Sequence, residues 1–189
     1  MNVALQYAVF FLSLRLPARI VRLAIALCAV ASAAVFTYTG VYLYSLEAIA
    51  FWHFPALIAV FVFASLSAGF SLMLLVTYFS SDSVTVLSTI KPLQRAHLVA
   101  IIAEAVAIGW LLFEQAKSPE CADSFALLTG NTMLPLSLIG VGGFALAIPF
   151  CLELSSVRSR NYRNIPGCDV LCLAGSLILR FIIVSCGMH

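Results

Sequence analysis

Hydrophobic residues form five long stretches in this chain, separated by short polar segments. The stretches cover residues 20–44, 55–79, 94–114, 131–153 and 169–187. Each is close to the roughly 20 residues that an α-helix needs to cross the hydrocarbon core of a bilayer. No stretch alternates with a period of two, as membrane β-strands do. Because backbone polar groups in lipid must be paired within the protein, the pattern predicts five transmembrane helices.

Prolines and glycines refine the helix boundaries. Pro55 and Pro92 fit the first turns of the second and third helices, where a missing N–H is harmless. Pro149 lies within the fourth stretch and predicts a kink there. Small residues in a membrane helix let a neighbouring backbone come close, which we expect at Gly140, Gly142 and Gly143.

A shorter apolar segment, residues 3–14, precedes the first stretch. It is too short to span a bilayer, and its positive charges follow it, whereas those of a secretory signal come first. The segment is interpreted either as an interfacial helix or as the end of a helix whose start lies upstream.

Composition agrees with the helix pattern. Of 189 residues, 63% are hydrophobic and 10% are charged, and the mean hydropathy is +1.10. Globular chains are about 45–50% apolar and about 25% charged. We therefore expect an all-α integral membrane bundle, a single transmembrane domain over residues 1–189, in contact with lipid and not with nucleic acid.

Charged residues sort the loops into two sets. One set holds nearly all loop lysines and arginines: Arg15, Arg19, Arg22, Lys91, Arg95, Arg158, Arg160 and Arg163. The other set holds Lys117 and most of the acidic loop residues. Short basic loops stay in the cytoplasm. Loops 15–22, 80–93 and 154–168 are therefore predicted to be cytoplasmic, whereas residues 45–54, 115–130 and the C-terminus are predicted to lie outside.

Two charged residues lie deep within the apolar stretches, Glu104 in the third and Arg180 in the fifth. A charge at the centre of a membrane helix costs on the order of 2.5–3.5 kcal/mol. We expect the two to form an ion pair or to share a polar network. Such a pair either holds two helices in register or takes part in a proton path.

His97 and Glu153 extend this hypothesis toward the cytoplasmic side. His97 precedes Glu104 by two helical turns on the same face, and Glu153 closes the fourth stretch on the same side. Together with Glu104 and Arg180 they could line a half-channel for protons. The simpler interpretation, which we favour for His97 and Glu153, is that both are solvated at the membrane interface.

Aromatic residues gather at the outer end of the first two helices: Tyr38, Tyr42, Tyr44, Phe51, Trp52 and His53. An aromatic belt at the membrane surface is the default interpretation. The alternative is a quinone head-group site with Tyr38, Trp52 and His53, because a quinone needs an apolar crevice, a hydrogen-bond donor and a proton-exchanging group.

No catalytic motif is evident. The three histidines offer no obvious facing pair for haem. Cys168 and Cys172 lie one turn apart but lack the spacing of a metal site, so the six cysteines are interpreted as small hydrophobic residues. We expect no catalytic residue and no metal.

Five segments in order resemble the NrfD/polysulfide-reductase membrane-subunit (PsrC-like) family: YTGVYL, AFWHFPALIAVFVFASLSAGFSLML, LVAIIAEAVAIGWLLF, GVGGFALAIPFCLEL and LAGSLILRFIIVSCG. They look like helices four to eight of its eight-helix fold, with Glu104 as the intramembrane glutamate. About three N-terminal helices of the family fold have no counterpart, and residues 3–14 look like the end of the third. Ala50 stands where the family prefers proline.

The resemblance implies a non-catalytic or quinone-reactive anchor subunit in a prokaryotic cytoplasmic membrane. Its partners would be a ferredoxin-like iron–sulfur subunit and a molybdopterin catalytic subunit, and it would exchange electrons with menaquinone or ubiquinone. The family's quinone pocket is built largely from the N-terminal bundle, and Tyr38 would be one of its walls. The rival hypothesis is a small proton-coupled transporter or channel that uses Glu104 and Arg180.

Overall fold

The computed structural model describes residues 18–46, 49–79, 83–122, 126, 128, 130, 133–158 and 166–187. Every regular element in these ranges is helical. The apolar segment 3–14 and the arginines at 15, 160 and 163 lie outside the described residues. Five of the helices are long and apolar enough to cross a membrane, which confirms the predicted all-α bundle.

The helices follow the predicted order. Helix α2 spans Ala18–Tyr44, α3 spans Pro55–Phe79, α4 spans Ser83–Lys117 and α8 spans Pro166–Gly187. The fourth span is composite: α6 (Met133–Pro135), η3 (Leu136–Ala147) and α7 (Ile148–Arg158). Two single 3₁₀ turns, η1 (Ala50–Trp52) and η2 (Pro119–Cys121), precede α3 and follow α4.

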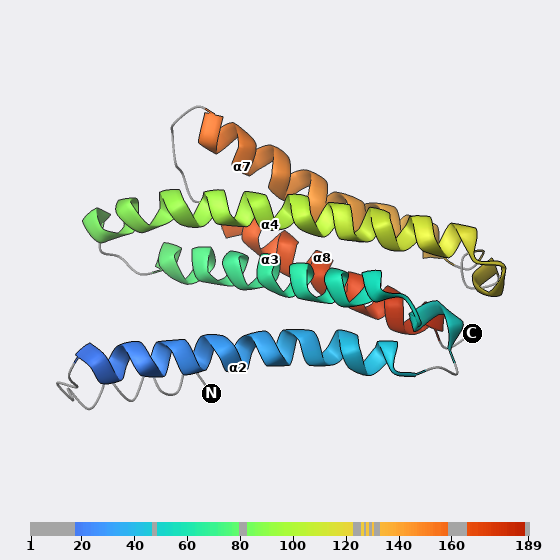
Figure 1. The fold of residues 1–189 in the computed structure, drawn as a ribbon. Coiled ribbons are helices and arrows are strands. Elements are labelled where there is room, and N and C mark those ends of the chain that lie inside the picture. The colour runs from blue at the N-terminus through green and yellow to red at the C-terminus, as the bar shows by residue number, and fades with distance from the viewer. Residues whose placement is uncertain are drawn as a thin grey trace.

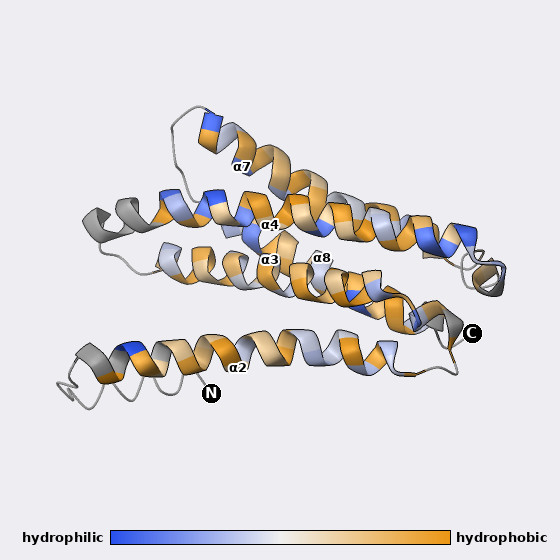
Figure 2. Cartoon of the chain, viewed as in Figure 1, coloured by the Kyte–Doolittle hydropathy of each residue, from blue (hydrophilic) through white to orange (hydrophobic). Residues whose placement is uncertain are grey.

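Helix α3 lies at the centre of the arrangement, packed against α2, α4 and α8 (Figure 1). Helix α2 lies at one side of the bundle and packs on α3. Only 6% of the apolar window of α2 is buried, against 44% in α3 and in α8. Hydrophobic residues run along most of each helix (Figure 2), so the outer surface suits lipid.

The third span begins earlier than the sequence indicated. Helix α4 starts at Ser83, so Pro92 lies inside the helix and not at its first turn. That prediction was wrong because Lys91, Gln94 and Arg95 interrupt the apolar pattern around Pro92, although the helix continues through them. The prediction for Pro55 is confirmed, since α3 begins at this residue.

The fourth span changes its helical form along its length. Residues Leu136–Ala147 form a π-helix, and the N–H of Ile148 bonds the carbonyl of Gly143, five residues earlier. Pro149 follows in α7 and is buried. It cannot donate a backbone hydrogen bond, and the wide turns lie directly before it. Long π-helical runs are rare in proteins.

Small residues set how closely the helices approach. A Cβ added to Gly175 of α8 would lie 2.5 Å from the backbone nitrogen of Ala145, and one added to Gly140 would lie 2.6 Å from Cγ2 of Ile178. At Gly140 the neighbouring helix comes close with the Ile178 side chain and not, as predicted, with its backbone. At Gly142 and Gly143 an added Cβ would meet only carbonyl oxygens of their own helix, near 4 Å.

The bundle interior divides into an apolar half and a polar half. The apolar half lies near η1 and is formed mainly by α3 and α8, with Trp52, Leu57, Phe61 and Ile183 among its members. Further along the same helices the buried residues become polar. They include Ser65, Ser67, Ser71, His97, Glu104, Glu153, Asp169 and Ser176.

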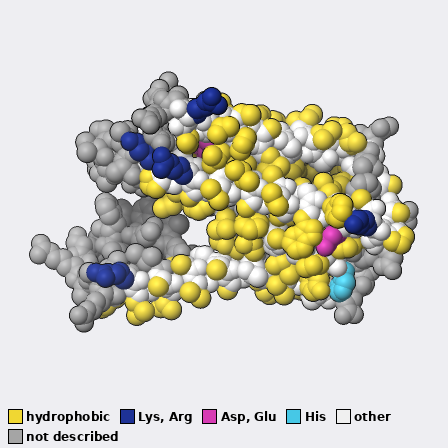
Figure 3. Space-filling view, turned by 45° about the horizontal axis from the view of Figure 1, so that its top comes forward, with side chains coloured by type: hydrophobic (Ala, Val, Ile, Leu, Met, Phe, Trp, Pro, Cys, Tyr) yellow, Lys and Arg dark blue, Asp and Glu magenta, His cyan; other side chains and the backbone are white. Residues whose placement is uncertain are grey.

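Basic side chains gather at the end of the bundle where α2, α4 and α8 begin and α7 ends (Figure 3). We call this the basic end. Its described members, all exposed, are Arg22, Lys91, Arg95 and Arg158. The opposite end carries Lys117, whose Nζ lies 3.9 Å from the ring centre of Phe113. The charge asymmetry in the sequence is therefore a property of the folded bundle.

Candidate functional site

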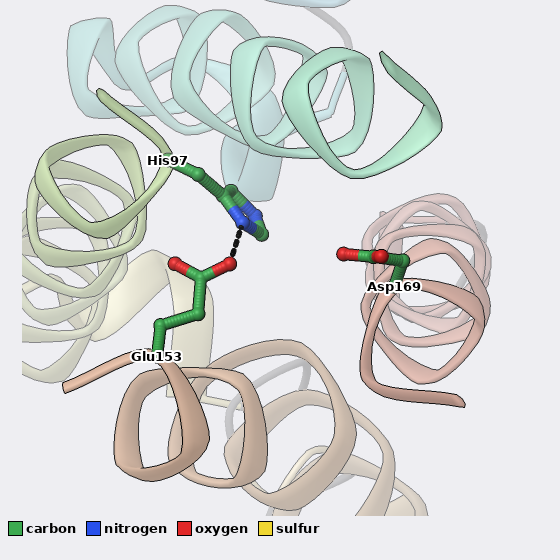
Figure 4. A group of neighbouring side chains, drawn as sticks. All are labelled: His97, Glu153 and Asp169. Atoms are coloured by element: carbon green, nitrogen blue, oxygen red, sulfur yellow. Dashed lines mark hydrogen bonds and ion pairs between the residues drawn. The ribbon is translucent and has the colours of Figure 1, made fainter. Parts of the chain in front are cut away.

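Three buried side chains from three helices meet in the polar half, near the basic end. His97 comes from α4, Glu153 from α7 and Asp169 from the first turn of α8. Their exposed fractions are 0%, 5% and 2%. One ligand atom from each lies within 4.8 Å of the other two. Figure 4 shows the carboxylate of Asp169 directed toward the pair formed by His97 and Glu153.

His97 is held on both sides of its ring. Nδ1 lies 2.5 Å from Oε1 of Glu153. Because an ionised carboxylate only accepts hydrogen bonds, Nδ1–H donates to it. Nε2 lies 3.0 Å from Oγ of Ser71 and 3.4 Å from Oγ of Ser67. The Sγ of Cys172 is 3.6 Å away on the same side. These contacts fix the orientation of the imidazole.

Helix α3 supplies the hydroxyl groups. Ser67 and Ser71 are four residues apart, so both point from the same face of the helix toward His97. Both are buried, with exposed fractions of 1% and 0%. Serine is small enough to keep the helices close while it satisfies a buried ring nitrogen. The serine-rich stretch of α3 therefore forms one wall of the site.

Several oxygens of the buried carboxylates have no hydrogen-bond partner in the described part of the chain. They are Oε2 of Glu153, Oδ2 of Asp169 and both carboxylate oxygens of Glu104. A buried polar group without a partner is unfavourable, and a buried charge more so. Buried groups of this kind call for an explanation, such as an ion, water or a functional role.

Glu104 and Arg180 do not form an ion pair within 4.0 Å among the described residues. Glu104 lies in the middle of the span Ile90–Lys117, whereas Arg180 lies nearer the end of its span than the start. The Nη2 of Arg180 instead donates to Oγ of Ser65, at 2.8 Å. Arg180 is thus bonded to α3 at Ser65, two residues before Ser67, which contacts His97.

Solvation at the membrane interface was the favoured interpretation for His97 and Glu153, and it is wrong. Both side chains are buried and bonded to each other. The prediction failed because a position near the end of an apolar stretch does not reveal which face of the helix the side chain occupies. Here α4 continues beyond the apolar stretch, and α7 covers the imidazole.

The aromatic residues expected to bind a quinone are distributed over different environments. Tyr38 is 67% exposed and stacks on Tyr42. His53 is exposed and stacks on Tyr44, with ring centres 4.9 Å apart. Trp52 is buried, and its Nε1 donates to the carbonyl oxygen of Ile183 at 3.0 Å. An aromatic belt therefore does not describe Trp52, which joins η1, just before the start of α3, to α8.

Sequence reasoning missed Asp169, Ser71 and the place of Cys172. Asp169 looked like the polar boundary of the fifth stretch, yet it is buried. The available signal was spacing: residues 169, 172 and 176 lie on one helix face. Ser67 and Ser71 form a similar polar face on α3. Only the packed structure shows that these two faces meet.

Comparison with known proteins places the chain in a family. No curated protein and no solved structure is similar enough to count as a match. The family model described as "Polysulphide reductase, NrfD" matches residues 3–189. This chain therefore belongs to the NrfD family, whose members are multi-pass membrane subunits of quinone-linked oxidoreductase complexes and associate with redox subunits.

Proposed function

We propose that this protein is the membrane anchor of a respiratory oxidoreductase complex and carries electrons between the quinone pool and an iron–sulfur subunit. A molybdopterin subunit would complete the complex and hold the catalytic centre. The observation that carries this proposal is the family match over residues 3–189. The five membrane-spanning helices support it, and we propose that they correspond to helices four to eight of the family fold.

The first test is the composition of the native complex. The protein would be purified from its own membranes in mild detergent, and co-purifying proteins would be identified by mass spectrometry with assays for iron, molybdenum and quinone. We expect an iron–sulfur subunit and bound menaquinone or ubiquinone. A chain that purifies without any redox subunit would contradict the anchor function and would favour the transporter hypothesis.

We propose that the quinone head group binds at the end of the bundle opposite the basic end, beside α2. There Tyr38 and His53 are exposed, Tyr38 stacks on Tyr42 and His53 stacks on Tyr44. Two aromatic surfaces and two hydrogen-bonding side chains are therefore available. Trp52 would form the inner wall of this site, where its indole is held in place because its N–H already donates a hydrogen bond to α8.

The change Tyr38→Phe tests this site. Loss of the phenol hydroxyl should raise the KM for quinol without loss of the complex. Tyr78→Phe is the matched control, because Tyr78 is also exposed and lies near the end of α3 at the basic end. Equal quinol kinetics in the two variants would remove Tyr38 from the binding site.

We propose that the basic end faces the cytoplasm of a prokaryotic cell. The exposed lysines and arginines at this end support it, because positive charges in short loops favour the inner side of the membrane. Reporter fusions at residues 85 and 160 should read cytoplasmic, and a fusion at residue 119 should read external. A periplasmic signal at residue 85 or 160 would invert the topology.

We propose a second function for Glu104, the exchange of protons with the quinone site. Its carboxylate is 1% exposed at mid-span, and neither oxygen has a hydrogen-bond partner in the described part of the chain. Arg180, bonded to Ser65, would balance the charge in the same interior. We propose that Glu104→Gln lowers proton uptake per turnover in vesicles. Unchanged uptake together with normal assembly would remove Glu104 from the mechanism.

A further inference from the structure

We propose that His97, Glu153 and Asp169 form a binding site for one divalent transition-metal ion, with Zn²⁺ as the expected occupant. The proposal does not rest on the function proposed above. It rests on the meeting of three buried side chains from α4, α7 and α8 (Figure 4). The ion would join these three helices at the basic end.

The donor set fits zinc. Zinc in proteins is bound by imidazole nitrogen and carboxylate oxygen at about 2.0–2.2 Å, usually with four ligands. In a tetrahedral site such ligands lie roughly 3.4 Å from one another. The ligand atoms here lie within 4.8 Å of one another. Small rotations of the Glu153 and Asp169 side chains would bring the oxygens to bonding distance, and a water molecule would complete the shell.

Two unpartnered oxygens point independently to a cation. Oδ2 of Asp169 and Oε2 of Glu153 are buried and have no hydrogen-bond partner in the described ranges. Figure 4 shows the carboxylate of Asp169 directed toward the imidazole of His97 from across the space between α4 and α8. Two carboxylates brought together away from water repel each other and lose hydration. A divalent ion at this position would balance both charges.

The surroundings of His97 match those of a metal-binding histidine. A ligating imidazole usually donates its other ring N–H to a fixed acceptor. With Nδ1 on the metal, Nε2–H would donate to Oγ of Ser71, which already lies 3.0 Å away. The metal would take the position of the proton between Nδ1 and Oε1 of Glu153, and the neutral imidazole would then carry its single proton on Nε2.

Cys172 lies close to the proposed site but is not one of the proposed ligands. Its Sγ lies 3.6 Å from Nε2 of His97 and 3.5 Å from Oγ of Ser67. These contacts place the thiol beside the ring nitrogen that faces α3, whereas the carboxylate of Glu153 contacts Nδ1. The site is therefore proposed as one nitrogen and two carboxylate donors without a thiolate, which spectroscopy can test directly.

The test uses the intact protein purified in mild detergent without chelator. We expect about one zinc per chain by elemental analysis. We also expect a lower Tm after removal of the ion with EDTA and recovery of the Tm when Zn²⁺ alone is returned. Cobalt in place of zinc should give ligand-field absorption bands without a thiolate charge-transfer band. Cys172→Ser should leave the zinc content and the cobalt spectrum unchanged.

Two variants assign the ligands, and a third controls for loss of charge. Asp169→Asn and Glu153→Gln preserve shape and should each weaken zinc affinity by at least about tenfold. Glu114→Gln is the control, since Glu114 lies on α4, as His97 does, but near the opposite end of the helix, bonded to Trp110. The proposal is overturned if the wild-type protein takes up neither zinc nor cobalt, or if EDTA leaves its Tm unchanged. These outcomes hold even if the variants fail to fold. Wild-type affinity in Asp169→Asn overturns the assigned ligand set.

Discussion

The contact between Gly175 and Ala145 offers the sharpest test of how this bundle is packed. A Cβ added at Gly175 would lie 2.5 Å from the backbone nitrogen of Ala145 and 2.7 Å from its Cα. Such contacts essentially never occur below 3.0 Å. Because the obstacle is backbone, no rotamer change relieves it, and α8 must move away from η3. We therefore expect Gly175→Ala to destabilise the protein.

The size of the effect follows from two opposing terms. Overpacking a tight interior costs about 1–3 kcal/mol. Replacement of glycine by alanine inside a helix gains about 1 kcal/mol. At Gly109, on the exposed face of α4, an added Cβ meets no atom within 4 Å, so Gly109→Ala should show only the gain. The two variants should then differ in free energy of unfolding by about 1–3 kcal/mol.

The difference can be measured by reversible unfolding in mixed micelles of SDS and a mild detergent. Tryptophan fluorescence is a suitable signal because Trp52 is buried in the apolar core. The comparison with Gly109→Ala removes the contribution of helix propensity, so it isolates the contact with Ala145. Equal free energies of unfolding for the two variants would show that α8 and η3 do not approach closely at Gly175 and Ala145.

Three further predictions concern other contacts between helices. Trp52→Phe removes the donor to a carbonyl of α8 and should cost about 1–3 kcal/mol in the same micelles, with unfolding followed by circular dichroism, whereas Trp110→Phe, which loses an exposed hydrogen bond on α4, should cost less; equal losses would contradict the buried bond. Ser65→Ala removes the hydrogen-bond acceptor of Arg180 and should lower the Tm, and an unchanged Tm would show that the bond is not formed. Gly40→Ala places a Cβ 2.9 Å from the α3 backbone and should increase proteolysis of α2 in detergent, with Gly109→Ala as the control; identical cleavage would contradict the close contact.

Much of the architecture depends on local properties of the chain. Five apolar stretches of sufficient length can only be helices in lipid, and the structure has five such helices in the expected order. Pro55 begins α3 because a proline lacks the N–H that a first turn leaves unused. Pro92 did not follow the same rule, since α4 begins at Ser83 and continues through Lys91 and Arg95, the charged residues that interrupt the hydropathy pattern.

The interior chemistry depends on tertiary contacts. The sequence presents Glu104 and Arg180 as the charged residues inside the membrane, and a shared depth favours their pairing. In the structure Arg180 bonds Ser65. In the described part of the chain, the shortest polar contact joins His97 and Glu153, two residues that the sequence places near a membrane boundary. Asp169 joins them because α8 packs against α3 and α7 and its first turn directs the carboxylate toward His97 and Glu153.

The physical reason for this division is the range of the forces involved. Hydrophobicity acts residue by residue against the solvent, so length and composition determine that the chain enters a membrane and where its helices lie. Between helices in lipid that driving force is absent, and close packing and hydrogen bonds decide which faces meet. These depend on small residues such as Gly175, on the serines of α3 and on the rotation of each helix. Only the assembled bundle brings His97, Glu153 and Asp169 together.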